Sequence, residues 1–134
     1  MLSIFPSLLI FGIFAPFILR VAVGVYLFYT GFGHLREERE SVTVELSDRF
    51  GTFSKSLVII GGLFEVVIGL SLIAGFLTQV MALLGSLYMI KLLVFKNNYP
   101  TWIKHEKIFY VMVLVILLSL LLTGAGAPAV DLPL

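Results

Sequence analysis

The sequence contains no cysteine and few charged residues. Without cysteine, the chain itself supplies no disulfide, thiolate nucleophile, iron–sulfur ligand or cysteine-zinc site. Only 13% of its 134 residues are charged, nine basic against eight acidic, and they form no unbroken block of lysine and arginine. Such a balance offers no field that would hold nucleic acid, so this class of function is excluded. Any electrons handled here must be carried by a ligand or a partner protein.

Apolar residues, in contrast, are far more frequent than in water-soluble domains. They make up 60% of the chain, and the mean hydropathy is +1.10. Soluble domains contain about 45–50% apolar residues, and a water-soluble fold of this length could not hide the excess. The sequence therefore predicts a single membrane domain over residues 1–134, an all-α integral membrane four-helix bundle.

Four apolar stretches predict the membrane crossings, because about 20 residues span the hydrocarbon core. The first stretch, residues 2–35, is too long for one perpendicular crossing, and Pro16 is a natural place to divide it. We expect an N-terminal interfacial or kinked extension before this proline, with one long tilted helix as the alternative. The crossings are predicted at about 16–35, 57–77, 80–95 and 108–123, with polar loops at 36–56 and 96–107.

Smaller signals refine this outline. Val42 to Leu46 alternates apolar and polar residues with period two, a weak strand signal. Thr78-Gln79 is predicted to form a tight turn between the second and third crossings. No basic residue precedes Arg20, so we expect the N-terminus to be retained rather than removed as a signal peptide. Tyr99, Trp102 and Tyr110 are expected to be aromatic anchors at the membrane surface.

The basic residues predict the orientation of the chain. Lysines and arginines are held on the cytoplasmic side during insertion. All those outside the crossings fall in the two polar loops, namely Arg36, Arg39, Arg49, Lys55, Lys96, Lys104 and Lys107. Both loops are therefore expected to be cytoplasmic and both termini external.

Four ionisable residues, Arg20, Glu65, Lys91 and Asp131, lie in or at the edge of the apolar segments. Each costs about 2.5–3.5 kcal/mol at the centre of a crossing helix, so each should face inward and find a partner. Depth along the helices suggests Glu65 with Lys91, and Arg20 with Asp131 on the external side. If the first helix tilts, Arg20 also reaches Glu65.

These residues have a structural and a functional interpretation, which we weigh about evenly. In the first, the pairs only fix the register of the helices. In the second, Glu65, Lys91 and Tyr88 line a polar pocket for a lipophilic ligand, for which a quinone is the natural candidate. Gly61, Gly62 and Gly69 flank Glu65 and are expected to serve close helix packing. His34 and His105 lack supporting carboxylate spacing, so we expect no metal or haem site.

Three segments resemble the DoxX-like family of small four-helix membrane proteins. They are Arg20 to Gly24 leading to Gly31-Phe32-Gly33-His34-Leu35, Gly62-Leu63-Phe64-Glu65 running into Gly69 to Thr78, and the closing Gly124 to Asp131. The resemblance covers most of residues 16–131. His34 stands where a lysine is usual, and Ala127 and Ala129 depart from a more polar tail.

The resemblance implies redox-associated work in a prokaryotic plasma membrane. Members look like membrane subunits of quinone-linked sulfur oxidation, or like anchors for soluble oxidoreductases, and other relatives resemble chaperones. Our first hypothesis is a quinone- or redox-associated subunit without autonomous catalysis, with a quinone or lipid as ligand and a soluble or membrane oxidoreductase as partner. The alternative is a non-enzymatic scaffold, assembly factor or chaperone that recruits a soluble partner through residues 36–56. A homodimer is compatible with either, because four helices leave large lipid-facing surfaces.

Overall fold

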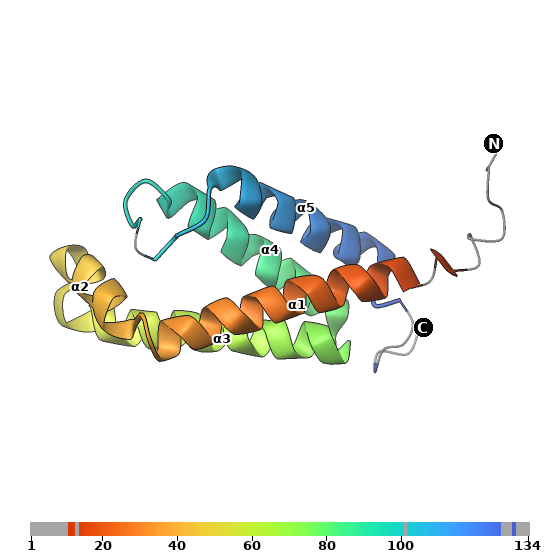
Figure 1. The fold of residues 1–134 in the computed structure, drawn as a ribbon, viewed down its shortest axis with the longest axis horizontal. Helices are drawn as coiled ribbons and strands as arrows, with labels where there is room; N and C mark the ends of the chain where they lie inside the picture. The colour runs from red at the N-terminus through yellow and green to blue at the C-terminus, as the bar shows by residue number, and fades with distance from the viewer. Residues whose placement is uncertain (1–10, 13, 101, 127–129, 131–134) are drawn as a thin grey trace.

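The computed structural model describes residues 11–12, 14–100, 102–126 and 130, and within them the fold is helical with no strand. The long helices run up and down as a bundle, which confirms the predicted fold class (Figure 1). The elements are α1 (Phe14–Leu35), α2 (Arg39–Phe50), the 3-10 helix η2 (Gly51–Phe53), α3 (Ser54–Ala74), α4 (Thr78–Phe95) and α5 (Lys107–Thr123).

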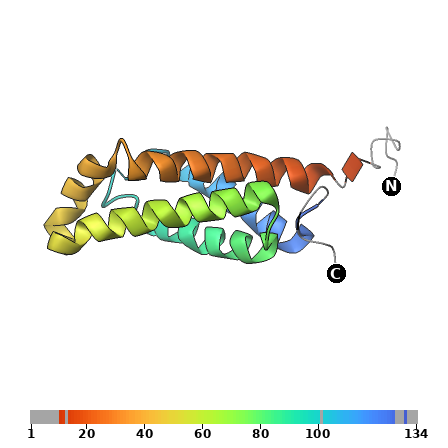
Figure 2. The same cartoon turned by 90° about the horizontal axis from the view of Figure 1, so that it is seen from below.

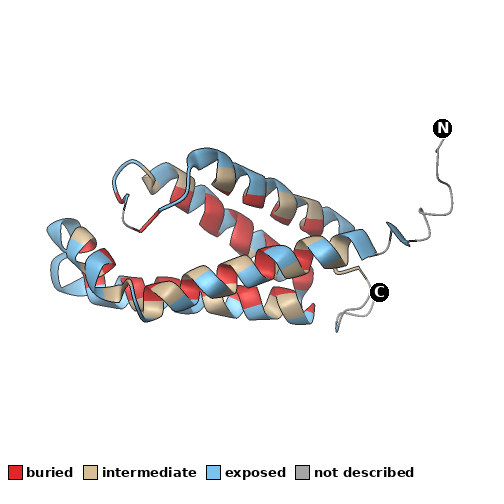
Figure 3. Cartoon of the chain, in the orientation of Figure 1, coloured by how far each residue is buried: buried red, intermediate tan, exposed pale blue. Residues whose placement is uncertain are grey.

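The bundle consists of two antiparallel helix pairs. Helix α1 packs along α3, and α4 packs along α5, with α2 at one end of the molecule (Figures 1 and 2). Each long helix turns its buried residues toward the others and exposes the opposite face, as Figure 3 shows. The end that carries α2 and the α4–α5 loop is called the α2 end below.

The outward faces are apolar, as lipid contact requires. Exposed side chains include Ile60 at 65% and Leu122 at 85% of their full exposure. Helices α1 and α4, and the helical stretch that contains α3, are long and apolar enough to cross a membrane. Helix α5 has 17 residues, at the lower end of the range of about 17–25 that spans the hydrocarbon core.

Glycines bring the backbones of α1 and α3 into direct contact. A Cβ atom added to Gly31 would lie 2.7 Å from the carbonyl oxygen of Gly62, and one added to Gly69 would lie 2.6 Å from the backbone nitrogen of Phe28. On α1, a Cβ atom added to Gly24 would likewise lie 2.9 Å from the carbonyl oxygen of Gly69. The predicted packing role of Gly62 and Gly69 is thereby confirmed.

The weak strand signal at Val42 to Leu46 was wrong, because these residues lie in α2. Val42 and Leu46 are four residues apart, one helical turn, and both are fully buried, whereas Val44 between them is 70% exposed. Burial therefore follows a period near 3.6 rather than 2. Five residues are too few to separate the two periods from the sequence alone.

The turn predicted at Thr78-Gln79 lies a few residues earlier. Helix α3 ends at Ala74, and Gly75 follows it in the left-handed conformation with φ of 71°. The amide of Phe76 donates to the carbonyl of Ser71 and that of Gly75 to Leu72, which caps the helix in a Schellman motif. Thr78 is already the first residue of α4.

Helix α1 begins at Phe14, with Pro16 inside its first turn, where a missing backbone donor costs nothing. Residues 1–10 and 13 of the predicted N-terminal extension lie outside the described residues.

Candidate functional site: a buried carboxylate beside an aromatic pocket

Glu65 is the centre of a buried polar cluster. It lies eleven residues into α3, about 16 Å along the helix axis, and is only 2% exposed. Its Oε1 accepts a hydrogen bond from the hydroxyl of Tyr88 on α4 at 2.6 Å, and its Oε2 lies 2.9 Å from Nδ1 of His34 on α1. Three helices thus converge on one carboxylate, which satisfies a group that would be costly to bury alone.

The cluster continues from His34 to the surface of the α2 end. Nε2 of His34 lies 3.7 Å from Oε2 of Glu38, just beyond the end of α1. Oε1 of Glu38 in turn lies 2.5 Å from the ammonium group of Lys104 in the α4–α5 loop. The side chains become more exposed along this line, from 3% for Glu65 and 8% for His34 to 27% for Glu38 and 54% for Lys104.

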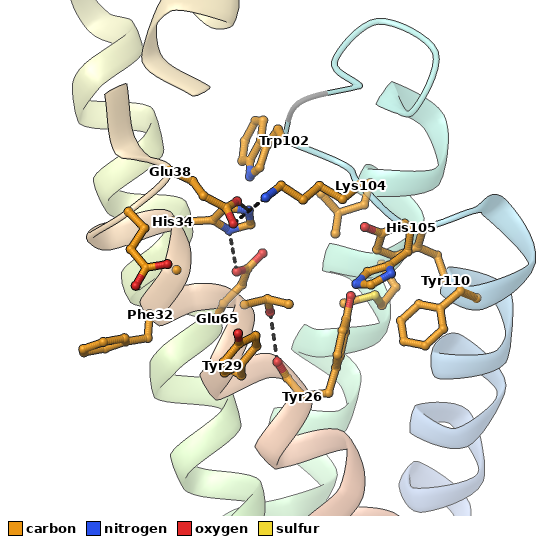
Figure 4. Close-up of a pocket in the computed structure, with 16 residues that line it drawn as sticks. Tyr26, Tyr29, Phe32, His34, Glu38, Glu65, Trp102, Lys104, His105 and Tyr110 are labelled. Atoms are coloured by element: carbon orange, nitrogen blue, oxygen red, sulfur yellow. Dashed lines mark hydrogen bonds and ion pairs between the residues drawn. The ribbon is translucent and has the colours of Figure 1, made fainter. Parts of the chain in front are cut away.

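A pocket of about 450 Å³ opens beside this cluster (Figure 4). It lies between the last turns of α1 and the first turn of α5, and the α4–α5 loop borders it. Glu65, His34 and Glu38 belong to its wall. The other lining residues are Tyr26, Tyr29, Thr30, Phe32, Gly33, Glu37, Met89, Leu92, Trp102, Lys104, His105, Phe109 and Tyr110.

Aromatic rings form much of the remaining wall. Tyr26 of α1 meets Phe109 of α5 edge to face with ring centroids 4.9 Å apart, and His105 lies 4.6 Å from the same phenylalanine. The ring of Trp102 stands edge to face with His34 at 6.5 Å. Figure 4 shows the indole nitrogen of Trp102 on the ring edge that faces Glu38 and Lys104. Among the residues that the structure describes, this buried nitrogen has no hydrogen-bond partner, an unusual state for a donor.

The α4–α5 loop is folded back into the bundle at this end. Trp102 is 7% exposed and Ile103 is fully buried. The sequence predicted Tyr99, Trp102 and Tyr110 as anchors at the membrane surface, but all three are buried. The backbone amide of Trp102 donates to Oε2 of Glu45 on α2 at 3.0 Å, and the ammonium group of Lys96 donates to the carbonyl of Ile103. The loop therefore closes the α2 end of the bundle.

The predicted site residues are only partly together. Glu65 and Tyr88 are hydrogen-bonded, but Lys91 does not pair with Glu65. Its side chain is exposed on α4, with the ammonium group 4.9 Å from the centroid of Trp102 and 5.3 Å from that of Tyr88. The carboxylate instead finds His34, whose imidazole approaches from the facing helix at the right depth.

Arg20 belongs to the opposite end of the bundle. Its guanidinium group is buried and donates to the carbonyl of Ala125, just beyond α5, at 2.8 Å. The chain after α5 therefore does return to Arg20, as the sequence suggested. Asp131, the predicted partner, lies outside the described residues.

Sequence reasoning considered His34 only as a metal ligand and so missed its role. A signal was present, since His34 follows Gly31 by three residues and Gly24 by ten and thus lies on the glycine face of the helix, which meets α3. Within the described part of the chain, no three His, Cys, Asp or Glu side chains gather closely enough to hold a metal ion.

Comparison with known proteins identifies the family. The sequence model of the DoxX family matches residues 15–97, more than half of the chain, from the start of α1 to the end of α4. The chain belongs to the DoxX family. It is accordingly an integral membrane protein whose apolar helix faces contact lipid. No curated protein and no solved structure matches it.

The matched region of this DoxX protein contains Glu65, His34, Glu38 and Tyr88, whereas Lys104 and the pocket side of α5 follow it. The carboxylate cluster is thus built almost entirely within the family region, and the chain after it completes the pocket.

Proposed function

We propose that the pocket at the α2 end binds a quinone or quinone-like lipid, and that the chain serves as a redox-associated membrane subunit without catalysis of its own. The observation that carries the proposal is an aromatic-walled pocket with a buried, hydrogen-bonded carboxylate and histidine at its base. Ligand pockets are typically apolar hollows of about 300–1,000 Å³ with a few well-placed polar groups, and this one falls within that range.

The position of the pocket suits a ligand that arrives through the bilayer. Tyr26 lies nine residues from the end of α1, about 14 Å along the helix, whereas His34 is one residue from that end. The pocket thus extends from the end of a crossing helix into the apolar layer. An isoprenoid tail can stay among the lipid chains while the ring enters between α1 and α5.

The wall chemistry suits a flat ring with oxygen atoms at its edge. The rings of Tyr26, Phe109 and Trp102 provide faces and edges for aromatic packing. His34 can donate to a carbonyl oxygen, and the buried indole N–H of Trp102 would gain an acceptor there. Because the chain has no cysteine, the electrons would come from an oxidoreductase partner.

Quinone binding can be followed through the chain's own fluorescence. Trp102 is the only tryptophan and lies in the pocket wall, so a bound quinone should quench its emission. We expect saturable quenching when protein in lipid nanodiscs is titrated with a short-tailed benzoquinone. Glu65→Gln should weaken the binding about tenfold, because the cluster that orients His34 loses its charge.

A pair of threonine variants separates pocket binding from collisions in the bilayer. Thr30→Phe fills the pocket from α1, whereas Thr43→Phe adds the same ring on α2, outside the pocket. The saturable component should vanish in the first variant and persist in the second. Saturable quenching that survives Thr30→Phe would rule out this pocket as the quinone site.

The scaffold hypothesis has support at a second place on the α2 end. A groove there is bordered by charges of both signs, Arg36, Arg39, Glu37, Glu40 and Lys55, and lies on the side predicted to be cytoplasmic. Arg36 and Lys55 are exposed, so the double variant Arg36→Glu, Lys55→Glu should leave the fold and quinone binding intact. If the chain is a scaffold, an oxidoreductase that co-purifies with the wild-type protein from native membranes should be lost in this variant. Retention of that partner would exclude the groove as its binding surface.

A further inference from the structure

We infer that Glu38, His34 and Glu65 form a proton path from the solvent at the α2 end to the buried base of the pocket, with Lys104 positioning Glu38 at its entrance. The inference deepens the proposed function and rests on it for its purpose. A quinone that receives two electrons from an oxidoreductase partner takes up two protons to become a quinol, and the path would deliver those protons one at a time.

The geometry of the cluster carries the inference. Glu65 Oε2 and His34 Nδ1 are already at hydrogen-bond distance, 2.9 Å. His34 Nε2 and Glu38 Oε2 are 3.7 Å apart, so a side-chain movement of about 1 Å brings them to a hydrogen bond. The three groups follow one another from the interior outward, and their exposure rises from 3% to 27% toward the surface.

Histidine is the side chain suited to the middle of such a path. Its two ring nitrogens face different carboxylates, and its ordinary pKa lies near physiological pH. A proton passes from Glu38 to Nε2, and the proton on Nδ1 passes to Glu65 Oε2. His34 is then left with its proton on Nε2, and the ring must rotate so that the protonated nitrogen faces Glu65 before the next proton passes inward.

Lys104 acts on Glu38 rather than on the proton itself. Its ammonium group holds Glu38 Oε1 at 2.5 Å, which leaves Oε2 directed at His34. Glu38 is partly exposed and can exchange protons with water. All three path residues line the pocket, so a ligand there would contact the path while it excludes bulk water from Glu65.

The charge environment of His34 includes groups from each element around it. They are Glu65 on α3, Tyr88 and Lys91 on α4, Glu37 and Glu38 after α1, Glu45 on α2 through Trp102, Lys104 and His105 in the loop, Tyr26 on α1 and Tyr110 on α5. Of the acidic groups among these, Glu65 lies 2.9 Å and Glu38 lies 3.7 Å from a ring nitrogen of His34. Protonated His34 would therefore lie between two carboxylates.

The test uses Trp102 as a reporter and needs no quinone. Its ring is 6.5 Å from that of His34, and a protonated imidazole quenches indole emission. In nanodiscs, we expect the emission to fall as His34 is protonated, and His34→Gln should abolish this change while His105→Gln retains it. A proton released by a laser flash should then quench Trp102 rapidly in the wild-type protein.

The path is tested by two neighbouring acid variants. Glu38→Gln should slow the flash-induced quenching about tenfold or more at unchanged final amplitude, because the amide cannot relay a proton. Glu40→Gln removes the same charge two residues away, at an exposed position outside the pocket, and should keep the wild-type rate. In Lys104→Met, Glu38 is present but is no longer held by the ammonium group, so the flash-induced quenching should slow to a smaller extent.

Equal rates in the Glu38 and Glu40 variants, or wild-type emission that does not respond to pH, would overturn the path. Either result would leave the quinone proposal standing if the pocket still binds a benzoquinone. Conversely, a protein that relays protons but shows no saturable quinone quenching would retain the path and lose the proposed function.

Discussion

Helix α1 meets its two neighbours in opposite ways. Against α3 it packs backbone to backbone, with Gly24, Gly31, Gly62 and Gly69 at the contact. Against α5 it meets through large aromatic side chains, and a pocket remains between them at the α2 end. The first contact leaves no space for a ligand, and the second contact provides that space.

The difference follows from how helices associate in lipid. Hydrophobicity gives helices no drive to associate in the bilayer, so close contact depends on small residues and on polar bonds. The α1–α3 contact uses glycines. At the opposite end of the bundle, the hydrogen bond from Arg20 to Ala125 ties α1 to the chain after α5. At the α2 end, the rings of Tyr26 and Phe109 keep α1 and α5 apart. One face of α1 therefore packs tightly against α3, and another face of the same helix borders the pocket.

The largest effect is expected from breaking the glycine contact. Gly31→Val places atoms where even a Cβ would be 2.7 Å from the carbonyl of Gly62, so α1 and α3 must separate. We expect a loss of roughly 3 kcal/mol or more in the free energy of unfolding. Denaturation in mixed micelles containing SDS measures it. A variant as stable as wild type would show that the two helices do not pack on these glycines.

A smaller effect is expected where α1 is tied to the chain after α5. Arg20→Lys keeps the buried charge but lacks the guanidinium group that reaches Ala125, so stability should fall by about 2 kcal/mol. Arg20→Met, which also removes the charge and every other contact of the guanidinium group, should cost more. Thermal unfolding in detergent, followed by circular dichroism, ranks the two. If Arg20→Met is the less damaging variant, the buried charge does not stabilise this end of the bundle.

The next largest effect is expected at the hydrogen bond between Tyr88 of α4 and Glu65 of α3. Tyr88→Phe removes the hydroxyl that donates to Glu65 at 2.6 Å, and we expect a loss of about 1 kcal/mol in the free energy of unfolding. Tyr29→Phe is the matched control, because Tyr29 is 77% exposed and should show no change. The same SDS denaturation applies to both. Equal stability of the two variants would contradict a structural role for the hydroxyl of Tyr88.

The smallest effect is expected two residues from the largest. Gly33→Ala places a Cβ no closer than 3.7 Å to any neighbouring atom, the nearest belonging to Glu38. Because alanine is the better helix former, stability should stay unchanged or rise by up to about 1 kcal/mol. Thermal unfolding of Gly33→Ala and Gly31→Val under the same conditions compares the stability of the two variants. A destabilised Gly33→Ala would mean that α1 faces α3 with a different side.

Much of the fold could be predicted from residue types alone. Four apolar stretches fixed the helices of the bundle to within a few residues, because the hydrocarbon core sets their length. Gly62 and Gly69 were recognised as packing positions, since small residues let helices approach closely in lipid. The predictions failed where the signal was short, at Val42 to Leu46 and at Thr78.

The candidate site was less accessible from sequence. Glu65 and Tyr88 were both predicted to line a polar pocket, and the structure joins them by a hydrogen bond. Depth alone also suggested Lys91 as a partner, but depth does not give the direction in which a side chain leaves its helix. Lys91 is exposed on α4, and its ammonium group contacts Trp102 and Tyr88 instead.

The sequence by itself determined that this chain is a helical membrane protein with a carboxylate that needs a partner in the apolar layer. This followed from composition, because the energy of placing charge and backbone in hydrocarbon depends on residue type and depth. Only the tertiary structure decided that the partner is His34 and that Glu38, Lys104 and Trp102 gather at the same end. Those choices depend on how helices rotate about their axes and how a loop folds back, which contacts between distant residues determine.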